Sequence, residues 1–291
     1  MGAVLGRNQY GKSQIRLLKV DRDDGGRHAL HDVNVSVALS GDLAATHLTG
    51  DNSSVLPTDT QKNTVFAFAR EHGVDQVEDF GSLLARHFVD SQPSIKWARV
   101  QVEEYPWSRV EVGGRPTDHS FAQSGQEMRT TSVTYDGRDT WVVSGLANLV
   151  LLNSTGSEFR GYPKDRYTTL AETSDRVLCT SVTARWRHAS RQPDWRKSYD
   201  VARRALVEAF ADTYSKSLQQ TLYAMGERVL GSCADVAEVR LSLPNRHHFL
   251  VDLSPFDLDN PGTVFHVDDR PYGLIEGTVR ADGAPAGDEA W

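Results

Sequence analysis

In the stretch LSLPNRHHFLVDL, residues 241–253, every second residue from Leu241 onward is apolar except at two positions. Successive side chains of a β-strand point to opposite faces, so every second residue shares a face. One of these two faces is apolar in five of its seven positions, which predicts a strand with a buried side. Asn245 and His247 interrupt that apolar face, whereas Arg246 and His248 fall on the other side.

Two polar side chains on a buried face need hydrogen-bond partners, because each unsatisfied group costs about 1–3 kcal/mol. Either a local network satisfies Asn245 and His247 inside the core, or both side chains face a ligand. Pro244 has no amide hydrogen, which predicts a bulge or a strand edge next to Asn245. Bulges often redirect side chains beside active sites. We expect this face to change from core to pocket at Asn245 and to return to core at Phe249.

The rest of the chain is expected to alternate between groups of strands and pairs of helical segments. Periodicity predicts strands at 13–20, 28–39, 94–110, 127–135, 139–152, 176–187, 237–253 and 263–280, and helices at 59–73, 76–91 and 198–231, the last with an irregularity near Ser215. This order occurs twice, so we predict an α+β fold of two similar halves, 1–118 and 119–291. Each half would be an antiparallel sheet with helices on one face. The open sheet edges favour an oligomer. The sequence suggests no role for the loop 111–119.

Composition excludes several classes of protein. The 291 residues carry a net charge of −7 without a basic block, so nucleic acid is not an expected partner. No apolar run approaches the roughly eighteen residues of a membrane span, and the N-terminus has no apolar leader. The two cysteines, Cys179 and Cys233, exclude zinc ribbons and disulfide frameworks and fit a reducing cytosol.

Common catalytic motifs do not occur, which leaves scattered polar residues to carry any chemistry. The chain has no phosphate-binding loop, no dinucleotide glycine fingerprint, no HExxH and no GxSxG. Arg176 opens a predicted strand, where it either extends to the solvent rim or binds a planar acceptor with its guanidinium. Gln219 lies beside an apolar helical stripe, and taken by itself it is expected to be a solvent-exposed residue at the edge of that stripe.

Two further positions have both a structural and a functional interpretation. Thr58 and Asp59 begin a predicted helix, where they either cap it or present amides and a hydroxyl to an anion. Lys12 follows Gly11 at a strand start, and a single lysine of this kind is usually a surface residue.

Five separated blocks of the sequence resemble one protein family. They are NQYGKSQIRLLKV, GDNSSVLPTDTQKNTVFAF, STGSEFRGYPKDRYTTLAETSDR, SLPNRHHFLVDL and DRPYGLIEGTV. In order, and nearly end to end, they resemble the cofactor-independent urate oxidases (uricases), with most similarity to the bacterial, actinobacterial type. The resemblance implies the tunnelling fold (T-fold), with two antiparallel half-domains in each subunit. It also implies a homotetramer with active sites at subunit interfaces.

The resemblance implies oxidation of urate by dioxygen to 5-hydroxyisourate and hydrogen peroxide in purine degradation, with no metal or organic cofactor. It assigns a role to each of several residues. Phe159 would stack on the purine, Arg176 and Gln219 would bind its polar edge, and Leu170 and Leu218 would line the pocket. Thr58 and Asp59 would reach the ligand from a neighbouring subunit. A proton relay would consist of Lys12, Thr58 and His247, and the site for dioxygen or water would consist of Asn245, Thr58 and Gly273.

One departure and two alternatives accompany this resemblance. Asn153 stands where the family is expected to have lysine, and the ending GAPAGDEAW lacks the Ser-Lys-Leu type of peroxisomal address, so a bacterial cytoplasm is expected. The first alternative is a zinc-dependent, pterin-handling enzyme of the same fold. His247 and His248 argue against it, because adjacent strand residues point to opposite faces and cannot chelate one ion. The second is a non-catalytic purine-binding protein.

Overall fold

The computed structural model describes residues 2–189, 193–284 and 287–291. The chain forms two compact units. The first unit comprises Met1–Gly145, Arg187–Arg196 and Pro285–Trp291, and the second comprises Leu146–Trp186 and Lys197–Ala284.

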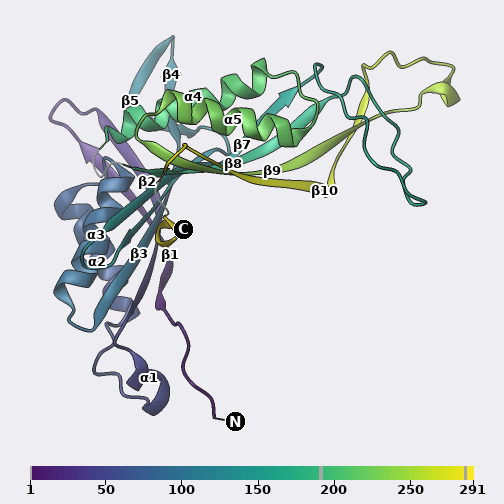
Figure 1. Ribbon diagram of the computed structural model, residues 1–291. Helices are drawn as coiled ribbons and strands as arrows, with labels where there is room; N and C mark the ends of the chain where they lie inside the picture. The colour runs from purple at the N-terminus through teal and green to yellow at the C-terminus, as the bar shows by residue number, and fades with distance from the viewer. Residues whose placement is uncertain (1, 190–192, 285–286) are drawn as a thin grey trace. The chain divides into compact units, whose positions relative to one another are not determined.

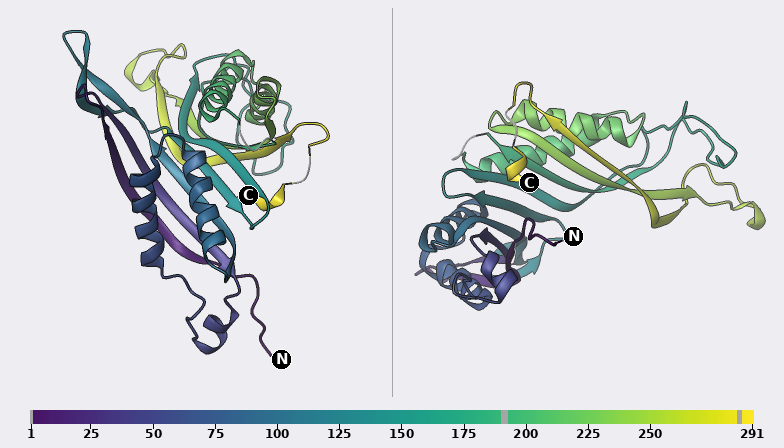
Figure 2. Two further views of the ribbon diagram at one scale, coloured as in Figure 1. Left: turned by 90° about the vertical axis from the view of Figure 1, so that its left-hand side faces the viewer. Right: turned by 60° about the horizontal axis from the view of Figure 1, so that its bottom comes forward.

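The first unit is an antiparallel sheet with helices packed on one face (Figures 1 and 2). Its elements are β1 (Tyr10–Arg22), β2 (His28–Gly41), α1 (Ala44–Thr49), α2 (Thr58–His72), α3 (Val77–Ser91), β3 (Ile95–Tyr105), β4 (Trp107–Val112), β5 (Arg115–Gln123), β6 (Met128–Tyr135), the start of β7 (Thr140–Asn153) and the short helix η2 (Asp288–Ala290). The strand order is β1-β2-β3-β6-β7, and α2 packs on β1 while α3 packs on β3 and β6. The apolar positions of β2 and α3 meet in this core, since Val33, Val35 and Leu84 are fully buried.

The second unit repeats this plan. Its elements are the remainder of β7, most of β8 (Leu178–His188), most of α4 (Trp195–Asp212), α5 (Leu218–Ser232), β9 (Val236–Leu250), the short helix η1 (Ser254–Phe256) and β10 (Phe265–Arg280). Its strand order is β7-β8-β9-β10, and Figure 1 shows α4 and α5 side by side on one face. Trp186, Leu206, Met225 and Leu243 are among its fully buried core side chains.

The predicted α+β class and the repeated order of elements are confirmed. The predicted helical stretch 198–231 consists of two helices whose connection contains Ser215, which confirms the irregularity expected there. The predicted boundary after residue 118 stays a prediction. The first compact unit runs through Gly145 and takes up two later segments. The segment 111–119 is mostly strand: it forms the tip of the β4–β5 hairpin, whose turn glycines Gly113 and Gly114 both have positive φ.

The expectation that β9 returns to the core at Phe249 is wrong. Leu241 and Leu243 are buried, whereas Phe249 is 50% exposed and β9 ends at Leu250. The reason is that β9 and β10 continue beyond the ends of the helices that pack on them, as Figure 1 shows. Alternation correctly gives the face of Phe249, but the helices do not reach that far.

The predicted irregularity near Pro244 lies on the neighbouring strand. His247 pairs with Asp268 and Asn245 pairs with Gly273, so four residues of β10 lie opposite the single residue between them. Pro244 itself remains in register with Leu274. The bulge therefore belongs to β10 and opens the ladder opposite Arg246, between the two polar residues.

Two further features bear on location and reactivity. Among the described residues, the structure contains no helix that is both long enough and apolar enough to cross a membrane. Cys179 and Cys233 are free thiols buried in the second unit. Burial raises the pKa of both thiols, to about 11 for Cys233.

A buried ionic network connects α3 to the sheet of the first unit. The Arg129 guanidinium of β6 donates to a carboxylate oxygen of Glu78 at 2.6 Å, and the Ser144 hydroxyl of β7 donates to the other oxygen at 2.7 Å. The Glu78 side chain is fully buried and that of Arg129 is 5% exposed. Both charges are thus removed from water and depend on each other.

We expect Glu78→Ala to lower the free energy of unfolding by about 3–5 kcal/mol, because it removes the nearer carboxylate partner of a buried guanidinium, whose other carboxylate partner, Glu104, lies 3.9 Å away. Urea denaturation measures this loss. Glu71→Ala is the matched control, since this exposed carboxylate near the end of α2 should change stability by less than about 0.5 kcal/mol. Equal stability of the two variants would contradict the proposed importance of the buried pair.

Candidate active site

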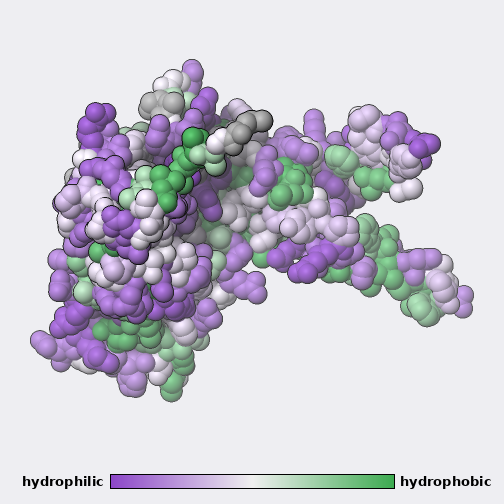
Figure 3. Space-filling view, turned by 90° about the horizontal axis from the view of Figure 1, so that it is seen from below, coloured by the Kyte–Doolittle hydropathy of each residue, from purple (hydrophilic) through white to green (hydrophobic). Residues whose placement is uncertain are grey.

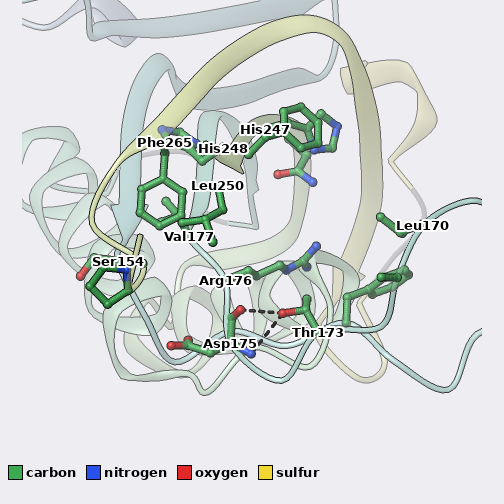
Figure 4. Close-up of a pocket in the computed structure, with 16 residues that line it drawn as sticks. Ser154, Leu170, Thr173, Asp175, Arg176, Val177, His247, His248, Leu250 and Phe265 are labelled. Atoms are coloured by element: carbon green, nitrogen blue, oxygen red, sulfur yellow. Dashed lines mark hydrogen bonds between the residues drawn. The ribbon is translucent and has the colours of Figure 1, made fainter. Parts of the chain in front are cut away.

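A pocket of the second unit lies where β9 and β10 extend past the helices. It has a volume of about 550 Å³, within the usual range for small-molecule sites. Figure 4 shows the residues around it. They come from the segment 154–177, from the end of β9 and from the segment leading into β10: Ser154, Phe159, Leu170, Ala171, Thr173, Asp175, Arg176, Val177, Asn245, His247, His248, Phe249, Leu250, Pro261, Gly262 and Phe265.

Asn245 and His247 line this pocket and are half-buried. Within the described part of the chain, neither side chain has a hydrogen-bond partner, and the His247 ring stacks on Phe249 at a centroid distance of 5.7 Å. This favours a ligand over a local network as the partner of both side chains. His248 also lines the pocket, contrary to the simple alternation argument, but Figure 4 shows it on the side of Phe265 and Leu250.

Arg176 is a half-buried cation in the pocket wall. Its Nε donates to the Ser157 hydroxyl at 3.2 Å, and its carbon Cζ lies 5.3 Å from the centre of the Phe159 ring. Over the described residues, its guanidinium forms no ion pair with a carboxylate. Burial lowers the pKa of Arg176, because the charged form loses hydration. The side chain therefore offers an uncompensated positive charge to a ligand, and Figure 4 shows it reaching toward Leu170 and His247.

Phe159 and Leu170 are held by one loop. The backbone of Phe159 exchanges two hydrogen bonds with Thr173, at 2.9 and 3.1 Å. The Phe159 ring stacks on Tyr162 at 4.9 Å and 16°, and the Tyr162 hydroxyl donates to the Leu170 carbonyl at 2.7 Å. An aromatic face thus stands beside the Arg176 guanidinium, which suits a planar anion.

Leu218 and Gln219 begin α5 and do not line the pocket of this chain. Leu218 is 2% exposed and packs in the core, so its predicted place in the pocket wall stays a prediction. Gln219 is exposed in the first turn. Capping there uses its neighbours instead, since the Ser217 hydroxyl accepts from the Gln220 amide and the Gln220 side chain accepts from the Lys216 amide.

Lys12, Thr58 and Asp59 lie together in the first unit. Thr58 and Asp59 start α2, which packs on β1, and no side chain caps this helix start. A hydrogen bond from Lys62 lowers the pKa of the Asp59 carboxyl, and the charge of Lys12 lowers it further. The capping interpretation of Thr58 is thus not supported.

The position of Lys12 in β1 depends on backbone geometry. A β-bulge follows it, where two residues of β1 lie opposite Ser36 of β2. A Cβ atom on Gly11 would lie 1.8 Å from the Val37 carbonyl oxygen, so only glycine allows this approach of the two strands.

The remaining predicted positions have clear places. Gly273 is the cross-strand partner of Asn245, which brings the two predicted oxygen-site residues together. Asn153 donates to the Phe210 carbonyl at 3.0 Å, so this departure from the family pattern joins β7 to α4. Sequence reasoning missed Ser157, Tyr162 and Thr173, whose only signal is membership of the block 154–176.

Within the described ranges, no group of possible metal ligands includes His247 or His248. Among the described residues, the side chains that could jointly hold an ion are Asp21, His31 and Asp75 of the first unit. The Lys19 ammonium already bonds to Asp21 there.

Comparison with known proteins agrees with this geometry. The family described as "Uricase" matches residues 8–134 and 142–276. The uricase of Arthrobacter globiformis is 46% identical over 288 residues, 99% of this chain and 93% of that protein. The uricase of Dictyostelium discoideum is 37% identical over 281 residues, 96% of this chain and 98% of that protein.

The fold comparison gives the same answer. A crystal structure of the Arthrobacter globiformis uricase superimposes with a TM-score of 0.93 at 45% identity, covering 99% of this chain and 98% of that one. The expected T-fold and the resemblance to actinobacterial uricases are confirmed. The chain belongs to the uricase family.

Proposed function

We propose that this chain oxidises urate with dioxygen and water, giving 5-hydroxyisourate and hydrogen peroxide, as a step of purine degradation. Family membership supports urate as substrate and an oxidoreductase activity. The observation that carries the proposal is the pocket of the second unit. Among the described residues, a guanidinium without a carboxylate partner, an aromatic face and two polar side chains without hydrogen-bond partners surround this one cavity. Urate is planar, anionic and polar around its edge, and these groups are complementary to it.

In this proposal the lining residues have distinct tasks, and so does Gln219, which lies outside the pocket lining at the start of α5. Phe159 stacks on the purine ring and Leu170 closes its side, while Arg176 and Gln219 bind opposite parts of the polar edge with coplanar hydrogen bonds. Asn245 holds dioxygen, peroxide or water above the ring, beside Gly273. Because the urate dianion can give an electron to dioxygen directly, we propose that no metal or organic cofactor takes part.

Proton transfer is assigned to Lys12, Thr58 and His247. Removing a proton from urate and delivering protons to reduced oxygen both require groups within hydrogen-bond reach of the reacting atoms. Lys12 and Thr58 belong to the first unit and His247 to the second. We propose that Thr58, with Asp59, reaches the ligand from a neighbouring subunit, so that the relay is complete only in the assembled protein.

We propose a homotetramer with active sites at subunit interfaces. The second unit supports this proposal, because its strand ends and loops expose large apolar side chains, seen as green patches on the right-hand projections of Figure 3. The exposed apolar side chains of this unit include Leu170, Phe249, Leu250, Phe256, Leu258 and Val267. Exposed apolar surface of this kind marks an interaction site. β1 and β10 also end the strand order with open edges.

We also propose a cytoplasmic location. The two buried thiols remain free in the structure, which fits a reducing compartment.

The reaction itself is tested by peroxide release. The purified protein, incubated with urate and air in the presence of a metal chelator, should produce one hydrogen peroxide for each urate consumed. Peroxide is measured by a coupled colorimetric assay and urate by its ultraviolet absorbance. Loss of activity with the chelator, or no peroxide from well-folded protein, would overturn the proposal.

We expect Lys12→Met to lower kcat by about 10²–10⁴-fold, the usual contribution of a general acid or base, while urate binding changes little. Steady-state kinetics and anaerobic titration with urate separate the two effects. Lys19→Met, on the same strand, is the control and should retain activity. Small and equal effects of Lys12→Met on turnover and affinity would remove this lysine from the relay.

We expect Asn245→Ala and His247→Ala to reduce urate oxidation strongly, at least about tenfold, because both unpaired side chains face the proposed oxygen and substrate positions. His248→Ala, which lies on the Phe265 side of the same pocket, should be much milder. Comparison of the kcat/KM values of the three variants tests this expectation. An equal loss in all three would show that the two sides of β9 are not distinguished by the chemistry.

A further inference from the structure

The Arg176 guanidinium is attached to the loop by a neutral hydroxyl. The Ser157 Oγ accepts from Nε at 3.2 Å, and the Arg176 amide donates to the Ser157 carbonyl at 2.9 Å. Ser157 is fully buried, so its hydroxyl is not exchanging between arginine and bulk water. This contact connects a pocket residue to one that does not line the pocket.

The choice of atom in this contact has a consequence for ligand binding. An arginine offers one Nε donor and two terminal nitrogens in a rigid plane. With Nε engaged by Ser157, the two terminal nitrogens remain for a ligand. A carboxylate in place of the hydroxyl would hold the plane equally well but would neutralise the charge that an anionic ligand requires.

Ser157 is itself fixed from a second direction. The Glu158 amide donates to the Ser215 carbonyl at 2.8 Å, and the Ser215 amide donates to the Gly156 carbonyl at 2.9 Å. The Thr221 hydroxyl of α5 donates to the Ser215 hydroxyl at 2.8 Å. The segment that holds Arg176 is thereby joined to the helix whose first turn carries Gln219.

We propose that Ser157 is the positioning residue for substrate binding: its hydroxyl holds the Arg176 guanidinium with both terminal nitrogens directed at the urate edge. This inference rests on the proposed function, since urate is the anion concerned. It adds a residue that touches no substrate and acts only through Arg176. The hydroxyl sets the orientation of the plane, and its neutrality preserves the positive charge.

The test compares Ser157→Ala with Thr155→Ala. Thr155 lies on the same loop and loses a comparable hydroxyl, but that hydroxyl donates to Asp175 and not to Arg176. We expect Ser157→Ala to weaken anaerobic urate binding by about tenfold, the usual value for a hydrogen bond to a charged group, and Thr155→Ala to leave it unchanged. Ser157→Cys keeps the side-chain size with a weaker acceptor, so it should show the same weakening if the alanine variant does not fold.

A double-mutant cycle separates positioning from a merely structural role. The kcat/KM for peroxide release should fall about tenfold when Ser157→Ala is made in the wild type and should not change when it is made in Arg176→Ala. An equal further loss in the Arg176→Ala background would overturn the inference, as would identical binding by the Ser157 and Thr155 variants. Failure of the wild-type protein to oxidise urate would overturn the proposed function instead.

Discussion

The strands of the second unit are longer than the helices that cover them, and this mismatch creates the site. A 15-residue strand such as β9 extends about 50 Å, whereas a 15-residue helix such as α5 extends about 22 Å. One face of the sheet is therefore core over part of its length and uncovered over the rest. The exposed side chains of Phe249 and Leu250 occur in the uncovered part of β9, and so do Asn245 and His247, which line the pocket there.

Most of the fold follows from periodicity, because apolar spacing distinguishes a strand from an amphipathic helix. The helical stripe predicted α3 to within one residue at each end, whereas the alternation in β9 placed the strand correctly but extended it three residues too far. How far the helices cover a strand depends on tertiary packing, which alternation does not report. The same alternation therefore placed Phe249 in the core, although the core ends before that residue. The bulge was expected from Pro244, yet it lies in β10, since a missing amide hydrogen does not say which strand carries the extra residues.

The site was predictable in part. Asn245 and His247 are visible from the sequence, because polar residues on an apolar face conflict with burial. Lys12 and Arg176 came from the family resemblance, since a single cation at a strand start has no distinctive pattern. Ser157 had no signal beyond its place in the block 154–176: a serine in a polar loop is ordinary, and only the fold shows that it is buried against a guanidinium.

The burial of the two cysteines affects how readily their thiols can be oxidised. Hydrogen peroxide oxidises thiolates far more readily than thiols, and the proposed reaction releases peroxide beside the chain with every turnover. Cys179 and Cys233 are both enclosed, and burial raises their pKa, to about 11 for Cys233, so little thiolate is present near neutral pH. The packing of the second unit thus keeps both thiols in the protonated form, which reacts more slowly with peroxide than the thiolate does.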